Sequence, residues 1–189
     1  MTWQRRLIHA ASRVHAYQNY SLRFNNPPPA FETTSTMSVT LVLPQGYTYV
    51  LASAVSILPL LTWQTYRVGK ARAASGIKYP QLYAEKAEAE ASKEALLFNC
   101  MQRAHQNTVE LLPIILLGTL VTGLSHPYIA ASLCTTFVIS RAIYTIEYAA
   151  GNPSRRNARG GAFGIYSAGM LMMTATWTVG RMLFAELSS

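Results

Sequence analysis

Long apolar runs separated by short polar segments dominate the chain after about residue 40. The hydrocarbon core of a bilayer is about 30 Å thick and takes about 20 helical residues. Four segments reach that length, and they cover residues 45–68, 95–124, 127–150 and 161–187. We expect four membrane-spanning helices, the first kinked at Pro59. In the fourth, small residues should let helices approach closely, namely Gly164, Ala168 and Gly169. The pattern predicts an all-α integral membrane four-helix bundle.

Lysine and arginine concentrate in two of the segments that connect these helices. Arg67, Lys70, Arg72 and Lys78 follow the first helix, and Arg155, Arg156 and Arg159 follow the third. The turn at residues 123–127 carries no lysine or arginine. In a chain that crosses the membrane four times, the two basic segments lie on the same side. Because cytoplasmic loops are enriched in lysine and arginine, we expect both in the cytosol.

Residues 1–36 differ from the rest of the chain, which we treat as a second domain of residues 37–189. The extension carries four arginines before its first acidic residue, Glu32, and contains three consecutive prolines at 27–29. An arginine-rich, acid-poor start is typical of a mitochondrial transit peptide. Met37 lies just before the first apolar run, so the extension can also be a dispensable disordered leader or a gene-model artefact. Both interpretations place it outside the membrane fold.

The composition supports a membrane protein. Half of the residues are hydrophobic and 13% are charged, against about a quarter charged in soluble domains. The net charge of +8 sits largely in short connecting segments, so we do not expect nucleic-acid binding. Cys100 and Cys134 lie in apolar stretches without a Cys-x-x-Cys pattern. We therefore expect two reduced, buried thiols and no metal site.

The second apolar segment begins with a polar stripe. Asn99, Arg103, Asn107 and Glu110 follow at intervals of four, four and three residues, so they share one helix face. Ionisable side chains at membrane depth normally face a bundle interior or a wet cavity. Arg103 and Glu110 are two turns apart, which is too far for a simple salt bridge within one helix. Two interpretations follow: they hold the two ends of a polar ligand, or they pair with other helices through Arg141 and Glu147.

The third segment has a comparable face, formed by Arg141, Tyr144 and Tyr148. Its tyrosines would either contact a ligand or anchor the helix at the membrane interface. The arginines that follow would attract an anion or simply set the topology. His105 lies off the stripe, and we interpret it as a hydrogen-bonded structural residue. No Ser-His-Asp set, phosphate-binding glycine loop or carboxylate pair suggests another class of enzyme.

Several motifs resemble one known family. They are FNCMQRAHQNTVELLP in the second segment, VGKARAASGIKYPQLY after the first, SRAIYTIEYAAGNPSRR around the end of the third, and ARGGAFG before the fourth. In this order and spacing the chain resembles the membrane-associated proteins in eicosanoid and glutathione metabolism over about residues 43–187. Within that family it is most similar to the type 3 microsomal glutathione transferases.

The resemblance implies a homotrimer of four-helix subunits, with glutathione bound between neighbours near the cytosolic side. It also implies the residues that bind glutathione: Arg72, Arg103, Asn107, Glu110, Tyr144 and Tyr148. An arginine just past the third helix should stabilise the glutathione thiolate. Arg155 and Arg156 both match that position, and we prefer Arg156. No metal is implied.

The expected function is a membrane-bound glutathione transferase or glutathione-dependent peroxidase. Its second substrates would be lipophilic electrophiles or lipid hydroperoxides that enter from the bilayer. His105 and Leu111 stand where leukotriene-forming relatives differ, so leukotriene synthesis is not implied. The expected location is the endoplasmic reticulum membrane, with the mitochondrial outer membrane as the alternative. The alternative function is that of a non-catalytic lipid-presenting or scaffold protein of the same superfamily.

Overall fold

The computed structural model describes residues 42–150 and 153–188, and within these ranges the regular secondary structure is entirely helical. The elements are α2 (Tyr47–Val55), α3 (Ile57–Ser75), α4 (Lys86–Ala91), α5 (Lys93–Gly123), α6 (Pro127–Tyr148), the 3₁₀ helix η1 (Pro153–Gly160) and α7 (Phe163–Leu187). The all-α prediction is confirmed for this part of the chain. The extension at residues 1–36 and the alternative start at Met37 lie outside it.

Three of the four predicted long helices are found within about two residues of their expected ends. The first is instead divided in two, because α2 ends at Val55 and α3 begins at Ile57. The expected kink at Pro59 thus lies one turn earlier. Proline clashes with the carbonyl of the residue four positions before it, and for Pro59 that residue is Val55, the last of α2. The helix also runs past its predicted end at residue 68, to Ser75.

The segment between α3 and α5 contains a short helix that the apolar pattern did not predict. Its start is stabilised by a capping box, in which Glu85 and Glu88 each bond the other's backbone amide. At the start of α5 the hydroxyl of Ser92 accepts a hydrogen bond from the Ala95 amide at 3.3 Å. Hydrogen bonds from its own backbone amide and from Ser92 lower the pKa of Glu94. These caps explain why α5 begins at Lys93.

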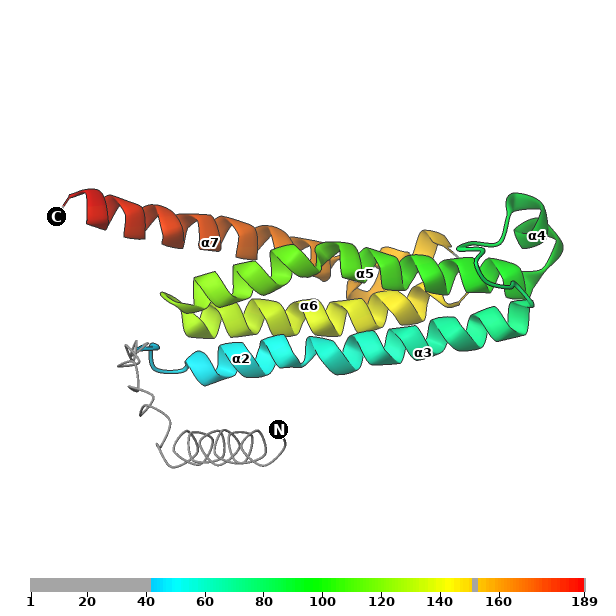
Figure 1. Cartoon of the computed structure of the whole chain (residues 1–189), viewed down its shortest axis with the longest axis horizontal. Helices are drawn as coiled ribbons and strands as arrows, with labels where there is room; N and C mark the ends of the chain where they lie inside the picture. Colours follow the sequence, from blue (N-terminus) through cyan, green and yellow to red (C-terminus); the bar gives the residue numbers. More distant parts are fainter. Residues whose placement is uncertain (1–41, 151–152, 189) are drawn as a thin grey trace, which may run out of the picture. The chain divides into compact units, whose positions relative to one another are not determined.

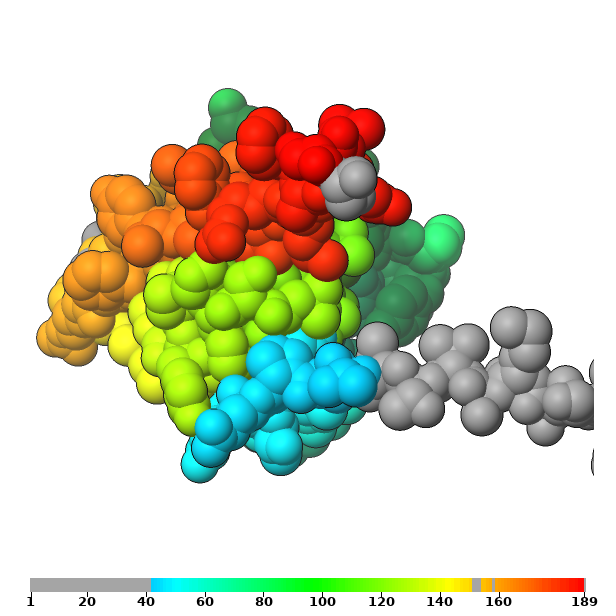
Figure 2. All heavy atoms as spheres, turned by 90° about the vertical axis from the view of Figure 1, so that its left-hand side faces the viewer, coloured from blue at the N-terminus to red at the C-terminus, as the bar shows by residue number. Residues whose placement is uncertain are grey.

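Helices α5 and α6 form the centre of the structure (Figure 1). Helix α3 packs on α5, α2 packs on α6, and α7 packs on both central helices. Viewed from the end that carries the α5–α6 turn, α7 and α2 lie on opposite sides of the central pair (Figure 2). One buried cluster joins the layers, with members that include Ile57, Ile115, Phe137 and Leu171.

Small residues bring α7 close to its neighbours at two positions. A Cβ atom added to Gly118 of α5 would lie 2.9 Å from the Cβ of Leu171. A Cβ atom added to Gly164 would lie 2.8 Å from the Nε of Arg141, which confirms the expectation for Gly164. Ala168 is buried in the shared core. For Gly169 no such approach is found within the chain, because apart from its own turn of helix no atom lies within 4 Å of an added Cβ.

Among the helices in the described ranges, α6 is the one that is long and apolar enough to cross a membrane. The polar half of α5 and the break at Ser56 interrupt two of the other predicted spans. The end of α7 is apolar but uncovered: every residue from Val179 to Ser188 is exposed, including Leu183 and Phe184.

Candidate functional site

Arg103 and Glu110 form an ion pair along the surface of α5. The Nη1 atom of Arg103 donates to Oε1 of Glu110 at 3.0 Å, and the side chains are 44% and 49% exposed. The prediction that these residues lie too far apart to pair was wrong. Seven residues rise about 10.5 Å along a helix, and the two long side chains together span that length. The pair presents both charges at an accessible surface.

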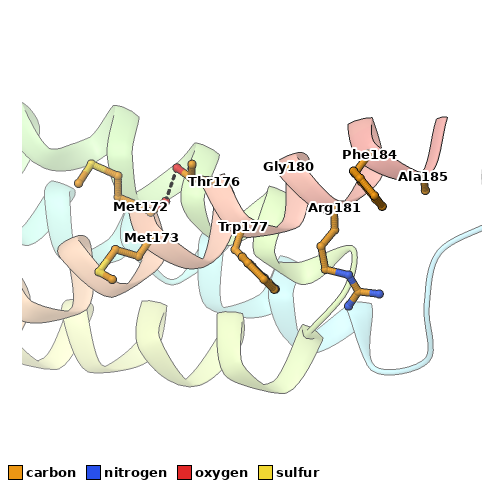
Figure 3. Close-up of a pocket in the computed structure, with 8 residues that line it drawn as sticks. All are labelled: Met172, Met173, Thr176, Trp177, Gly180, Arg181, Phe184 and Ala185. Carbon is orange, nitrogen blue, oxygen red and sulfur yellow. Dashed lines mark hydrogen bonds between the residues drawn. The ribbon is translucent and has the colours of Figure 1, made fainter. Parts of the chain in front are cut away.

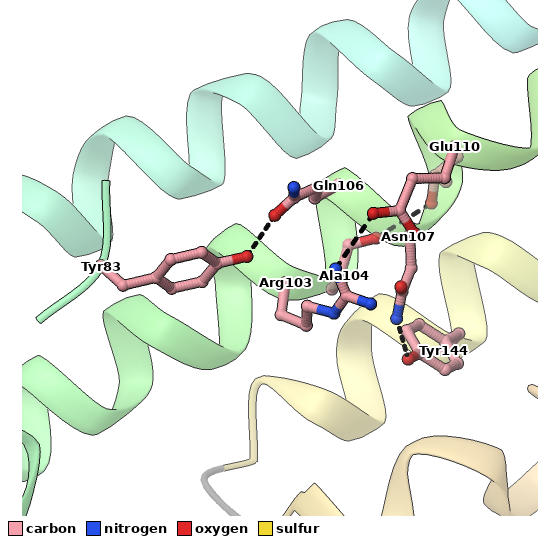
Figure 4. A network of polar contacts seen from close by, with 8 residues as sticks. Tyr83, Arg103, Ala104, Gln106, Asn107, Glu110 and Tyr144 are labelled. Carbon is pink, nitrogen blue, oxygen red and sulfur yellow. Dashed lines mark hydrogen bonds and ion pairs between the residues drawn. The ribbon is translucent and has the colours of Figure 1, made fainter. Parts of the chain in front are cut away.

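Next to this pair, α5 and α6 are joined by a hydrogen bond. The side-chain amide of Asn107 donates to the hydroxyl of Tyr144 at 2.8 Å, and Figure 4 shows this contact beside Arg103 and Glu110. The ring of Tyr144 is buried and meets the ring of Tyr148 edge-on, with centroids 5.5 Å apart. The predicted tyrosine face of the third segment therefore lies against the polar stripe of the second.

The segment between α3 and α4 supplies a third side to the site. The hydroxyl of Tyr83 donates to Oε1 of Gln106 (Figure 4), which brings the phenol close to Arg103. Asn99, the first residue of the stripe, bonds both backbone groups of Ala84, at 2.7 and 2.9 Å. Neither Tyr83 nor Gln106 was predicted as a site residue. The signal available was the position of Tyr83 at the end of the KYPQLY motif.

Arg72 lies outside this cluster. Its guanidinium is buried between the rings of Tyr79 and Phe98, with its central carbon 4.2 and 4.4 Å from their centroids. Its Nη1 donates to the carbonyl of Gln81 at 2.7 Å and lies 3.5 Å from the carbonyl of Ile77. The polar contacts of Arg72 are thus made with the segment that leads to Tyr83.

Two of the arginines that follow α6 form ion pairs with Glu147. Its carboxylate is 8% exposed, and lies 3.8 Å from Nε of Arg155 and 3.1 Å from Nη1 of Arg159. Arg141 instead points its Nη2 at the carbonyl of Gly161, at 3.4 Å. The hypothesis that Arg141 and Glu147 pair with the stripe of the second segment was therefore wrong. Glu147 pairs with arginines of η1, and Arg141 contacts the backbone just before α7.

Tyr148, the last residue of α6, lies between the stripe of α5 and the arginine loop, by which we mean η1 with Arg155, Arg156 and Arg159. Its ring meets the ring of Tyr144, and Arg103 of α5 and Arg156 of η1 both lie within electrostatic range of its hydroxyl. Arg156 is exposed, and Arg155 beside it is committed in part to Glu147. Of the predicted residues, the fold thus gathers Arg103, Asn107 and Glu110 with Tyr144, Tyr148 and Arg156, and it places Arg72 elsewhere.

A comparison with protein-family models identifies the chain. The model of the MAPEG family matches residues 50–179, which include every residue of this cluster. The chain belongs to the MAPEG family. MAPEG proteins are membrane proteins, and the family includes glutathione transferases as well as members without enzyme activity.

The match to the MAPEG family begins within α2 and ends within α7. It therefore contains α3, α5 and α6 in full and most of α2 and α7. The family resemblance expected from the QRAHQN motif and its companions is confirmed.

His105, which lies inside this motif, has the structural role expected for it. Its Nδ1 lies 3.4 Å from Oε1 of Gln64, and the Nε2 of the same glutamine donates to Thr108 and Thr145 at 3.0 and 2.7 Å.

Two further features of this MAPEG chain lie outside the cluster. Cys100 and Cys134 are buried and carry no disulfide, as expected. No group of three or more His, Cys, Asp or Glu side chains in the described ranges is arranged to hold a metal ion.

The outer face of α7 carries a groove of about 790 Å³. Its lining comes from α7 alone and includes Met173, Trp177, Arg181 and Phe184 (Figure 3). The hydroxyl of Thr176, which also lines the groove, donates to the carbonyl of Met172 at 2.8 Å. The groove contains none of the clustered polar residues, so we assign the candidate site to α5, α6 and the segments beside them.

Proposed function

We propose that this MAPEG protein is a membrane-bound glutathione transferase that also reduces lipid hydroperoxides with glutathione. The observation that carries the proposal is the ion pair of Arg103 and Glu110, with both charges about half exposed and 3.0 Å apart. One end of glutathione is an amino acid with a carboxylate and an ammonium on the same carbon. Such a zwitterion matches two opposite charges held close together.

The proposed binding mode exchanges the ion pair for the ligand. Arg103 binds the γ-glutamyl carboxylate, because a guanidinium offers two parallel donors to a carboxylate and stays charged. Glu110 accepts the ammonium. Asn107 and Tyr144, already bonded to each other at 2.8 Å, supply polar groups for the peptide part. The resemblance adds Tyr148 and Arg72 to this set.

The proposed activation step is electrostatic. A free thiol has a pKa of about 8.5 and is mostly protonated at neutral pH, whereas the thiolate is the nucleophile. A guanidinium beside the sulfur favours the thiolate, and lowering the pKa by two units requires about 2.7 kcal/mol. We assign this role to Arg156, with Arg155 as the second candidate.

Two reactions follow from a bound thiolate. In transfer, the sulfur attacks an electrophilic carbon, a carbon–sulfur bond forms, and the leaving group departs with the electron pair. In peroxide reduction, the sulfur attacks one oxygen, the O–O bond breaks, and the other oxygen leaves as an alcohol after protonation. The resulting glutathione sulfenic acid reacts with a second glutathione to give the disulfide and water.

The wider assembly is also part of the proposal. Four membrane spans would place residues 67–94 and 151–160 in the cytosol, and a homotrimer would bring neighbouring subunits to each glutathione site. The membrane would be that of the endoplasmic reticulum, or alternatively the mitochondrial outer membrane. Residues 1–36 would not belong to the catalytic fold, so a chain that starts at Met37 should insert and retain turnover.

The decisive experiment is a turnover assay on the full chain purified in detergent. We expect glutathione-dependent consumption of a lipid hydroperoxide and of a small aromatic electrophile. The Arg103→Ala variant is the matched control, because it removes the guanidinium proposed to bind the γ-glutamyl carboxylate of glutathione. If neither substrate is consumed while the protein is folded, the chain is not a transferase or peroxidase.

A non-catalytic lipid-presenting or scaffold role is the second candidate. One observation favours it: Arg103 and Glu110 already satisfy each other's charge, as a purely structural pair would. This role predicts that the folded protein binds a labelled fatty acid but leaves glutathione unbound in equilibrium dialysis.

A further inference from the structure

Tyr83 reaches the candidate site from outside the two helices that form it. The residue belongs to the segment between α3 and α4, and its side chain is only partly exposed. Its hydroxyl donates to Oε1 of Gln106, three residues after Arg103 on α5, and the phenol therefore lies close to the guanidinium of Arg103. In Figure 4, Tyr83 and Gln106 lie on one side of Arg103, and Asn107 and Tyr144 lie on the other. Tyr83 thus approaches Arg103 through Gln106, and Tyr144 approaches the same stripe through its hydrogen bond with Asn107.

The segment that carries Tyr83 is held at both sides of this residue. Immediately after it, both backbone groups of Ala84 are bonded to the side chain of Asn99, at 2.7 and 2.9 Å. Two residues before it, the carbonyl of Gln81 accepts a hydrogen bond from the buried Arg72 at 2.7 Å. Phe98 packs against the guanidinium of Arg72 at 4.4 Å, which ties this anchor to α5. The hydroxyl is therefore presented at Arg103 by a fixed segment of backbone.

We propose that Tyr83 is a further glutathione-contacting residue, whose hydroxyl donates to the same carboxylate that Arg103 binds. This inference rests on the proposed function and adds a residue to its site. Gln106 acts as a placeholder acceptor. When the γ-glutamyl carboxylate arrives at Arg103, the hydroxyl turns from the neutral amide oxygen to the charged one. Hydrogen bonds to an ionised acceptor are about twice as strong as those between neutral groups, so the exchange favours the bound state.

The same geometry assigns Arg72 a positioning role. Its contacts are with the carbonyls of Ile77 and Gln81 and with two aromatic rings, and it contributes to glutathione binding through Tyr83. A direct contact with glutathione, as the family resemblance implies, would make the effects of the two residues independent. The two possibilities therefore differ in whether their effects add.

The experiment measures glutathione affinity by titration calorimetry on the full chain in detergent. Tyr83→Phe removes only the hydroxyl, and we expect binding about tenfold weaker, the size of one charged hydrogen bond. Tyr128→Phe, which removes a hydroxyl near the opposite end of α6, is the matched control and should bind as the unaltered protein does. Thermal unfolding monitored by circular dichroism should be the same for both variants.

A ligand lacking the carboxylate sharpens the test. In γ-aminobutyryl-cysteinyl-glycine the γ-glutamyl carboxylate is absent, and Tyr83→Phe should not weaken its binding further. Equal weakening for both ligands, or no weakening for glutathione, overturns the role of Tyr83. If Arg103→Ala weakens glutathione binding and Tyr83→Phe does not, this inference alone fails. If the unaltered protein does not bind glutathione, the proposed function fails.

The positioning role of Arg72 has its own readout. Arg72→Ala should weaken glutathione binding, and the double variant Arg72→Ala/Tyr83→Phe should bind no more weakly than Arg72→Ala alone. Additive losses would instead show a direct contact by Arg72. Should Arg72→Ala fail to fold, Asn99→Ala releases the other anchor of the same segment and allows the same comparison.

Discussion

Arg103 and Glu110 pair across two full turns of α5, with 3.0 Å between Nη1 and Oε1. Because both side chains are about half exposed, the pair contributes at most about 1 kcal/mol to stability. Breaking this ion pair to bind a ligand therefore costs little free energy. The helix fixes the order and separation of the two charges, and this prepares the site for a ligand that carries a carboxylate and an ammonium at its end.

Arg103→Ala should weaken glutathione binding by about 30-fold or more, because a desolvated carboxylate that loses its charged partner costs about 2–5 kcal/mol. Glu110→Gln should weaken it through the ammonium. Equilibrium dialysis with labelled glutathione measures both. The reversed pair Arg103→Glu/Glu110→Arg is the control: it restores the ion pair and so should restore the melting temperature but not the binding. Normal binding in both single variants would mean that the pair is structural.

Arg156→Ala should leave glutathione binding largely intact while the bound thiol becomes harder to ionise. The arginine lowers the pKa of the thiol, so its removal should return that pKa towards about 8.5. The rate at neutral pH should therefore fall, and raising the pH should partly restore it. Arg155→Ala should have a milder effect, since the Nε of Arg155 lies 3.8 Å from the carboxylate of Glu147. Ultraviolet absorbance of the thiolate, titrated against pH, measures the shift. An unchanged titration in both variants and in their double variant removes the loop from the mechanism and points to Tyr148.

Gly118→Ala should destabilise the packing of α5 on α7. The added Cβ would lie 2.9 Å from the Cβ of Leu171 and 3.2 Å from its carbonyl carbon, so the helices must separate. Overpacking of this kind costs about 1–3 kcal/mol, and the melting temperature in detergent should fall. Gly169→Ala on α7 is the control, because no atom lies within 4 Å of its added Cβ and alanine favours helix. Equal melting temperatures for the two variants would contradict the close approach.

The arginine loop should be accessible from the cytosol. Asn157 is exposed, and Asn157→Cys provides a labelling site there. Background labelling should be low, because Cys100 and Cys134 are buried. A membrane-impermeant maleimide should label the variant in sealed microsomes without detergent. Labelling that requires opening of the lumen would reverse the orientation.

The sequence predicts the long helices well because their boundaries depend on local chemistry. Pro127 begins α6 at its first position, where the missing amide proton costs nothing. Pro59 shows the limit of such reasoning: the disturbance of the helix appears at Val55 and Ser56, one turn before the proline, because the clash is with a carbonyl.

The site was predicted only in part, for physical reasons. Helical periodicity brings Arg103, Asn107 and Glu110 onto one face, and the structure keeps them there. The partners of Glu147 depend on how η1 folds back towards α6, and the place of Tyr83 depends on the path of an irregular segment. Neither path has a period that a pattern can reveal. The stripe was identified, but the segments that close over it were not.

The polar contacts of Gln64 have a consequence for the order in which the protein is made. Its amide donates to Thr108 and Thr145, and its carbonyl oxygen lies near His105. This hydrogen-bond network therefore joins α3, α5 and α6 and contains no residue of α7. A growing chain that has been synthesised as far as Tyr148 already contains every member. These contacts between α3, α5 and α6 can therefore form while the last helix is still in the ribosome, and α7 then completes the shared core with Ala168 and Leu171.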